Sequence, residues 1–202
     1  MAFTFFFRDT HTLDHAVKFL IPEVSGRSRV SIWDAGCAFG PEPYTLAMIL
    51  AEAMGGFAFQ NVRIYATDID ESGQFGNVIA NGVYSNEELG RIPPEILSKY
   101  FDRTGGKEGF YTLNESIRNR VKYQKHDLLS LSPIGDSFSL IICKNVLLHF
   151  QYQERIEVIR MFHKSLAPGG LFATEQTQKM PEEIKHLFEQ VVSDAQLFRK
   201  VV

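Results

Sequence analysis

Apolar runs and amphipathic stretches alternate along most of the chain. Five runs have the length and content of buried strands, at residues 30–34, 62–68, 121–127, 138–144 and 171–175. Three stretches have helical spacing, at residues 41–54, 71–81 and 152–166. Strands that alternate with helices predict an α/β, Rossmann-like fold with a mostly parallel sheet and helices on both faces. We expect Gly55-Gly56 to end the first helix and Pro168-Gly169-Gly170 to close the last.

The pattern changes between residues 83 and 123. A short helix predicted at 94–101 is followed by Gly105-Gly106 and then by alternating aromatic and polar residues. Such a stretch is typical of a small antiparallel hairpin appended to a sheet. We therefore expect one domain over residues 1–202, with 83–123 as a small appended subdomain.

Composition narrows the class of protein. The 202 residues are 45% hydrophobic and carry a formal net charge of −3, which predicts one globular domain without the basic excess of a nucleic-acid-binding protein. No run approaches the roughly 20 apolar residues of a membrane span, and residues 1–7 lack the charged start of a signal peptide. Two cysteines are too few for a disulfide framework. We expect a cytoplasmic protein that is not itself a membrane protein, and we predict no metal site.

The turn from Asp34 to Gly40 links the first strand to its helix and is the most informative segment. Its small residues, Gly36 among them, allow a flat ligand to approach the backbone. Asp68 ends the next strand, where a carboxylate commonly binds a ribose diol. Glu42 in the first turn of the helix disfavours a phosphate there. An adenosine ligand with a sulfonium and an amino acid, such as S-adenosylmethionine (SAM), suits these residues better.

Five blocks carry a more specific resemblance. They are TFFFRD from Thr4, WDAGCAFGPEPYTLAMIL from Trp33, ATDID with GVYSNEEL from Ala66, FSLIICKNVLLHF from Phe138 and LAPGGLF from Leu166. In this order they resemble the chemotaxis-receptor methyltransferases of the CheR type. The resemblance implies a class I SAM-dependent enzyme that esterifies glutamate carboxylates of a chemoreceptor or related signalling protein and releases S-adenosylhomocysteine. We expect the chain to be the catalytic domain without the family's helical N-terminal domain.

The resemblance also implies the site residues. Cofactor contacts are expected from Thr4, Arg8, Gly36, Glu42, Asp68, Asp127, Leu128, Lys144 and Asn145. Arg8 would meet the methionyl or the substrate carboxylate, and Glu42 the methionyl end of the cofactor. Asp68 would hold the ribose hydroxyls, a role for which Asp70 could be mistaken. Asp127 and Leu128 would border the adenine.

Two positions near the expected methyl group depart from the family. Lys144 stands where arginine precedes Asn145, and His149 stands where tyrosine is usual. Arg8 and His149 are the catalytic candidates, although a carboxylate is already ionised at pH 7 and needs no strong base. His149 could be a hydrogen-bond donor in place of tyrosine or a packed helix-cap residue.

The C-terminal part departs from the family as well. Thr174-Glu175-Gln176-Thr177 replaces a Gly-His-Ser-Glu-like run. Residues 184–192 fit a helix face, but the family favours a last strand at 196–202 with 187–192 as its partner or as a helix end. Two other functions stay open, a methyltransferase for another acceptor and a cofactor-binding sensor without turnover.

Overall fold

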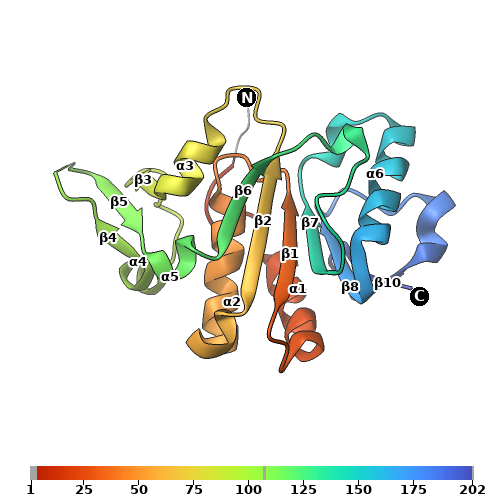
Figure 1. The fold of residues 1–202 in the computed structure, drawn as a ribbon, viewed down its shortest axis with the longest axis horizontal. Coiled ribbons are helices and arrows are strands. Elements are labelled where there is room, and N and C mark those ends of the chain that lie inside the picture. Colours follow the sequence, from red (N-terminus) through yellow and green to blue (C-terminus); the bar gives the residue numbers. More distant parts are fainter. Residues whose placement is uncertain (1–3, 107, 202) are drawn as a thin grey trace.

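A seven-stranded sheet forms the centre of the computed structural model, which describes residues 4–106 and 108–201 (Figure 1). The strands lie in the order β6-β2-β1-β7-β8-β10-β9. Their bounds are β1 (Val30–Ala35), β2 (Val62–Asp68), β6 (Val121–Lys125), β7 (Phe138–Cys143), β8 (Leu166–Thr174), β9 (Phe188–Gln190) and β10 (Leu197–Lys200). The first five strands of this order are parallel, and β10 is antiparallel to both of its neighbours. The predicted Rossmann-like fold is confirmed.

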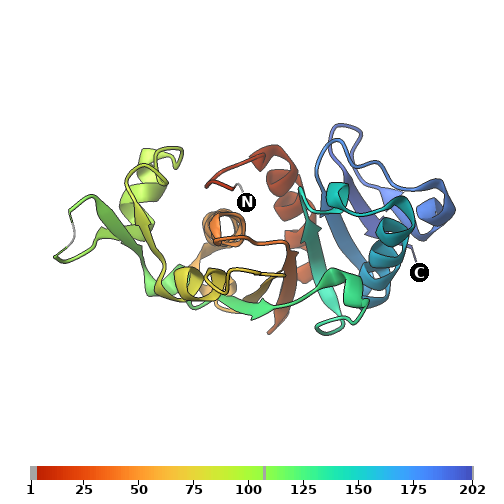
Figure 2. The same cartoon turned by 90° about the horizontal axis from the view of Figure 1, so that it is seen from above.

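Helices cover both faces of this sheet, as expected (Figure 2). One face packs against α1 (Thr10–Val24), α2 (Pro41–Phe59) and α3 (Phe75–Asn81), and the other against α6 (Tyr152–Ser165). Neighbouring side chains of β1 pack on opposite faces of the sheet. Ile32 belongs to the first core cluster and Trp33 to the second. Among the described residues, no helix has the length and apolar character needed to cross a membrane.

Helix α1 was not predicted. Its buried side chains include Leu13, Val17, Leu20 and Val24, which recur at helical spacing. The usual start signal is absent, because Asp9 at the N-cap is left-handed and its side chain makes no capping hydrogen bond. The helical spacing of these apolar residues was therefore the available signal. It follows soon after residues 5–7, a segment that was interpreted as part of the site.

Several predicted element ends are wrong by a few residues. Helix α2 breaks at Gly55 (φ 74°, ψ 157°) but resumes to Phe59, because the glycine allows a non-helical residue without ending the helix. Helix α3 begins at Phe75, since the preceding residues form a turn around Asp70. Pro168-Gly169-Gly170 lies within β8 and does not cap α6, which ends at Ser165. The pairing of β7 with β8 shifts register here, which accommodates these residues in the strand.

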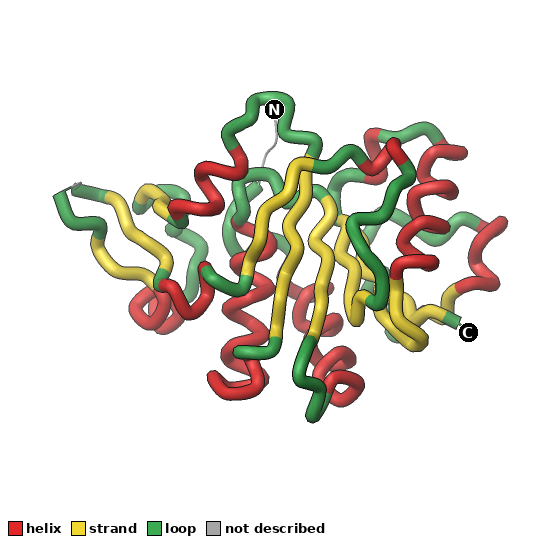
Figure 3. Tube along the Cα trace, in the orientation of Figure 1, coloured by secondary structure: helices red, strands yellow, loops and turns green. Residues whose placement is uncertain are grey.

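A second, three-stranded antiparallel sheet follows α3, as the fold class predicted. It consists of β3 (Val83–Ser85), β5 (Phe110–Leu113) and β4 (Phe101–Arg103), accompanied by α4 (Pro94–Tyr100) and α5 (Glu115–Arg118). Figure 3 shows this sheet at the opposite end of the molecule from the C-terminus. Buried Tyr84 attaches it to the main body, since its hydroxyl donates to the Phe39 carbonyl (2.9 Å) and its ring meets Phe6 edge-on at 4.9 Å.

The C-terminal residues form strands, as the family pattern favoured. The 3-10 helix η3 (Glu182–Leu187) leads into β9, which pairs antiparallel with β10. The predicted last strand ran to residue 202, which lies outside the described residues, and the observed strand ends at Lys200. The hairpin completes the edge of the main sheet beside β8.

Candidate cofactor and active site

A cavity of about 630 Å³ lies at the carboxyl ends of β1, β2 and β7. In the sheet, β1 lies between β2, which follows it in sequence, and β7, so the strand order reverses at β1. Parallel sheets open a ligand-binding crevice where the strand order reverses. All ten predicted site residues line the cavity: Thr4, Arg8, Gly36, Glu42, Asp68, Asp127, Leu128, Lys144, Asn145 and His149. Gly36 and Asp68 were expected here from their place at strand ends, and the other residues from the family resemblance.

One wall, which we call the turn side, consists of Gly36, Ala38, Thr67 and Asp68. The amides of Gly36 and Cys37 donate to the Thr67 carbonyl (2.7 and 3.0 Å), and the Ala38 amide donates to Asp68 Oδ2 (2.9 Å). Gly36 has φ +106°, and a Cβ there would lie 2.1 Å from Val146 Cγ2. The turn therefore requires glycine, and backbone hydrogen bonds hold the Asp68 carboxylate at the cavity wall.

Asp70 has a different role from Asp68, which answers the ambiguity in the sequence. Its side chain is buried and accepts hydrogen bonds from the amides of Gln74 and Phe75 and from the Tyr123 hydroxyl (2.9 Å). Burial acts to raise the pKa of Asp70, but these hydrogen bonds outweigh it and lower the pKa. Asp70 fixes the start of α3 and does not line the cavity.

A second part of the wall, which we call the ion-pair side, consists of Arg8, Glu42, Lys144 and Asn145. Lys144 Nζ lies 3.0 Å from Glu42 Oε2, and the side chains are 0% and 12% exposed. Burial raises the pKa of Glu42, and the Lys144 ammonium opposes that shift. At the position where the resemblance implies an arginine, this chain therefore has a single buried ammonium paired with one carboxylate.

Arg8 and Asn145 complete the ion-pair side. The Arg8 guanidinium donates to Asn145 Oδ1 (3.2 Å), and Lys144 Nζ donates to the Arg8 carbonyl (3.5 Å). Asn145 has φ +59°, a left-handed conformation that asparagine tolerates. The backbone amide of Asn145 donates to Glu175 Oε2 (3.0 Å), so the Glu175 side chain holds this residue in place. The sequence analysis noted Glu175 only as a departure from the family.

Asp34 is an acid that the sequence analysis did not assign to the site. Its side chain is fully buried near the ion-pair side, and neither carboxyl oxygen has a hydrogen-bond partner among the described residues. Burial, followed by the charge of Glu42, raises the pKa of Asp34 well above its ordinary value, while Lys144 opposes the shift. The carboxyl group therefore favours its neutral form.

Another part of the cavity is lined by the three residues that directly follow β6 in sequence, His126, Asp127 and Leu128. Asp127 Oδ1 accepts from the Leu129 amide (2.9 Å) and caps the 3-10 helix η1 (Leu128–Ser130). His126 was missed, although its Nε2 is buried without a hydrogen-bond partner among the described residues. Burial lowers the pKa of His126, so its imidazole favours the neutral form. Its adjacency to Asp127 was the available signal in the sequence.

His149 lies at the end of the 3-10 helix η2 (Leu147–His149) and lines the cavity. Its side chain is exposed, as is that of the neighbouring Leu148. The packed helix-cap interpretation is therefore wrong for this residue. An exposed imidazole at the cavity wall can contact a ligand or an incoming substrate.

Comparison of the sequence with known protein families identifies the family of this chain. Residues 2–197 match the family described as CheR methyltransferase, SAM binding domain. The chain belongs to this family. Its fold is accordingly that of a class I SAM-dependent methyltransferase, and SAM is its cofactor.

Named relatives extend the match. The chain is 32% identical to chemotaxis protein methyltransferase 1 of Pseudomonas aeruginosa over 189 residues, which is 89% of this chain and 68% of the relative. It is 34% identical to the chemotaxis protein methyltransferase of Escherichia coli over 174 residues, covering 83% and 57% of the two chains. A probable chemotaxis protein methyltransferase of Rhizobium etli is 27% identical, with 94% and 72% covered. The chain thus spans between 57% and 72% of the length of these relatives.

The residues of the cavity fit SAM. Gly36 lets the turn pass close to Val146 at the cavity wall, and the Asp68 carboxylate is fixed where it can accept hydrogen bonds from a diol. Carboxylates at Glu42 and Asp68 suit a ligand with a positively charged sulfonium, while Arg8 suits its carboxylate. Ile69, Leu128 and Leu129 provide apolar surface for a flat ring.

Proposed function

We propose that this protein transfers a methyl group from SAM to glutamate carboxylates of a chemoreceptor-like protein. The observation that carries the proposal is the polarity of the cavity. Asp68 on the turn side can take the ribose, and Arg8 on the ion-pair side can take a carboxylate beside the exposed His149. The names of the relatives support a chemotaxis protein as the substrate.

Bound SAM supplies a methyl group activated by the positive charge of its sulfonium. A glutamate carboxylate oxygen would attack the methyl carbon in line with the carbon–sulfur bond, whose electron pair stays on sulfur, so the products are a methyl ester and S-adenosylhomocysteine. Because the carboxylate is ionised at neutral pH, the protein needs to supply position and desolvation and no general base.

The side chains of the cavity would divide this positioning. Arg8 would orient the substrate or methionyl carboxylate through its planar fork. Lys144 neutralises the buried charge of Glu42 and so limits repulsion of an anionic substrate from that wall. His149 would donate a hydrogen bond to the substrate in place of the family's tyrosine. Thr4, Asp127 and Leu128 would complete the cofactor contacts.

Three wider expectations belong to the same proposal. We propose that the partner is a protein and not a nucleic acid, that the reaction occurs in the cytoplasm, and that residues 1–202 act as one domain with 83–123 as a subdomain. These expectations are supported by the net charge of −3 and by the family to which the chain belongs.

Methanol release tests the reaction. The protein would be incubated with labelled SAM and receptor fragments whose methylation sites are glutamate or, as a control, glutamine. The expected result is base-labile label on the glutamate fragments alone. SAM binding by calorimetry with no transfer to any fragment or cell extract would favour a sensor without turnover. Label that is found only on small acids would indicate another acceptor.

A further inference from the structure

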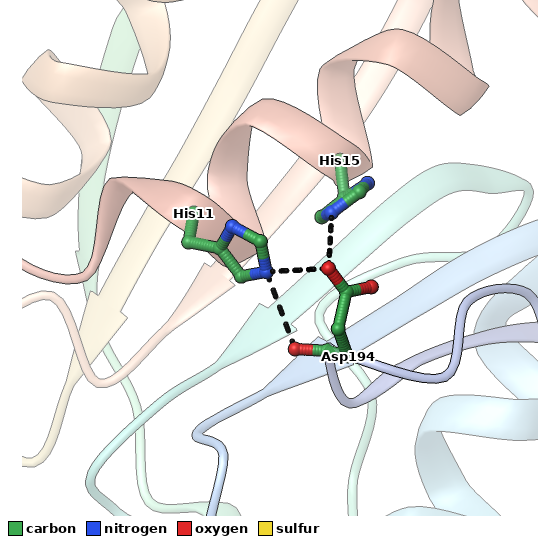
Figure 4. Close-up of side chains that lie close together, drawn as sticks. All are labelled: His11, His15 and Asp194. Carbon is green, nitrogen blue, oxygen red and sulfur yellow. Dashed lines mark hydrogen bonds and ion pairs between the residues drawn. The ribbon is translucent and has the colours of Figure 1, made fainter.

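Three side chains outside the cavity converge on one point of the surface. His11 and His15 lie on α1, and Asp194 lies in the loop between β9 and β10 (Figure 4). His11 Nε2 is 3.1 Å and His15 Nε2 is 3.5 Å from the same oxygen, Asp194 Oδ2. The three atoms that could bind a metal all lie within 4.8 Å of one another.

The two separations from Asp194 Oδ2 are close to those between the ligands of a metal ion. Residues four apart on a helix share one face, so both imidazoles can point at one position. Bonds of about 2.0–2.1 Å to a tetrahedral Zn²⁺ place neighbouring ligand atoms about 3.3 Å apart. The observed separations of 3.1 and 3.5 Å lie on either side of that value. An ion could enter between these atoms with small side-chain movements.

An ordinary ion pair accounts for the arrangement less well. Protonating both imidazoles would place two positive charges beside one carboxylate that is 59% exposed, where ion pairs contribute little to stability. His11 Nε2 also lies 3.2 Å from the backbone carbonyl oxygen of Asp194, a hydrogen bond that an ion bound at Nε2 would replace. Two imidazoles with a carboxylate suit Zn²⁺ and similar ions, whereas Mg²⁺ and Ca²⁺ prefer oxygen ligands alone.

We propose that His11, His15 and Asp194 bind a divalent transition-metal ion of the Zn²⁺ type. The ligands come from segments 179 or more residues apart, so the ion would tie the first turns of α1 to the β9–β10 loop. None of the three lines the cavity, which makes the site a cross-link and not part of the methyl-transfer machinery. Gln176 Nε2 donates to the Asp194 carbonyl (3.1 Å) and helps to fix the loop.

The sequence analysis predicted no metal site and did not consider His11 and His15, whose spacing alone is weak evidence for one. Asp194 joins them only through the fold. The proposal is independent of the proposed methyl transfer, since a failure to bind metal would leave the cavity and its residues unchanged.

Zn²⁺ titration of the chelator-treated, tag-free protein tests the site. Calorimetry is expected to show one ion per chain, and Co²⁺ to give the visible absorption of a tetrahedral complex. His15→Ala and Asp194→Ala should each weaken Zn²⁺ binding at least tenfold. His186→Ala is the matched control, because that histidine is exposed and lies outside the cluster.

Thermal unfolding provides a second readout. Zn²⁺ should raise the melting temperature of the wild-type protein and of His186→Ala, and a chelator should reverse the effect. His15→Ala should lose this response while its metal-free melting temperature stays close to wild type. Equal Zn²⁺ affinity in all variants, or no binding by the wild type at millimolar Zn²⁺, would overturn the proposal.

Discussion

The two walls of the cavity differ in charge and in how they are held, since the turn side has the single carboxylate of Asp68 and the ion-pair side has Arg8, Lys144 and Glu42. On the turn side, backbone amides of Gly36, Cys37 and Ala38 hold the strand end and Asp68 in place. On the ion-pair side, side chains separated by 102 residues or more along the chain hold one another, as Lys144 holds Glu42 and Asn145 accepts from Arg8.

This difference determines what a substitution removes. A side chain on the turn side can change without dismantling the turn, because most of its hydrogen bonds are made by the backbone. On the ion-pair side, removing Lys144 leaves Glu42 buried without its paired charge. We therefore expect stability to depend on the ion-pair side and cofactor affinity to depend on Asp68.

The largest expected effect comes from Lys144→Met. This change keeps the length of the side chain but leaves Glu42 buried without its ammonium, which typically costs about 3–5 kcal/mol. The free energy of unfolding from urea titration is the measurement. Adding Glu42→Gln should recover much of the loss, because both charges are then gone.

Lys99→Met is the matched control for that prediction. Lys99 Nζ lies 2.6 Å from Glu52 Oε1, but the two side chains are 56% and 39% exposed. Solvent screens such a pair, so its loss should be much smaller than that of Lys144→Met. Equal losses in the two variants would show that the ion-pair side does not support the fold.

Asp68→Ala should weaken SAM binding about 10- to 100-fold, equivalent to about 1–3 kcal/mol for a lost hydrogen-bonded charge. Because the amides of Gly36 and Cys37 still bind the Thr67 carbonyl, the melting temperature should change little. Calorimetry with SAM and S-adenosylhomocysteine measures the affinity. An unchanged affinity would remove Asp68 from the cofactor site.

Asp70→Ala should lower stability and leave SAM affinity unchanged, the reverse of Asp68→Ala, if the roles of the two acids are assigned correctly. It leaves two backbone amides and the Tyr123 hydroxyl without their acceptor, so stability should fall. SAM affinity of the folded fraction should stay near that of the wild type. A loss of affinity without a loss of stability would mean that the roles are exchanged.

Part of the cavity could be predicted because three of its residues stand at or near strand ends, whereas Thr4, Arg8, Glu42 and His149 were expected only from the family resemblance. Gly36, Asp68 and Asn145 stand directly after β1, at the end of β2 and soon after β7, and the carboxyl ends of parallel strands meet at one edge. The same reasoning explains why the turn side was easier to predict from the sequence than the ion-pair side. Its contacts are either local or fixed by the pairing of β1 with β2.

The features that were missed depend on distant contacts. Glu175 reaches the backbone amide of Asn145 because β8 lies beside β7, and Asp34 lies buried near Glu42 and Lys144 only through the fold. No local pattern marks either property. Helix α1 is different, since its apolar period was readable and only its capping signal was absent.

Asp34→Asn should stabilise the protein at neutral pH by about 1 kcal/mol, because it removes an ionisable group that is buried without hydrogen bonds. Its raised pKa means that the folded state holds the proton more tightly than the unfolded state. Wild-type stability relative to the variant should therefore fall as pH rises above the ordinary value of 3.8, and level off once the buried carboxyl ionises.

Urea unfolding from about pH 4 to pH 8 measures this difference. Glu42, Asp68 and Lys144 are the charged groups that act on Asp34, and all three stay in the variant. Asp136→Asn, on the exposed surface, is the control and should track the wild type at every pH. A variant that is less stable than wild type at pH 7 would show that the Asp34 carboxylate is charged and compensated.

The smallest effect is expected at His149, which is exposed and lines the cavity. His149→Phe keeps a ring but removes the hydrogen-bond donor, so methyl transfer should fall about two- to tenfold, the size of one hydrogen bond. SAM affinity and melting temperature should stay unchanged, because the side chain is exposed. His149→Tyr restores a donor and should recover transfer, whereas His186→Phe, outside the cavity, should have no effect. If His149→Phe transfers methyl groups as fast as the wild type, the imidazole is only part of the wall, and the ion-pair side must orient the substrate through Arg8 alone.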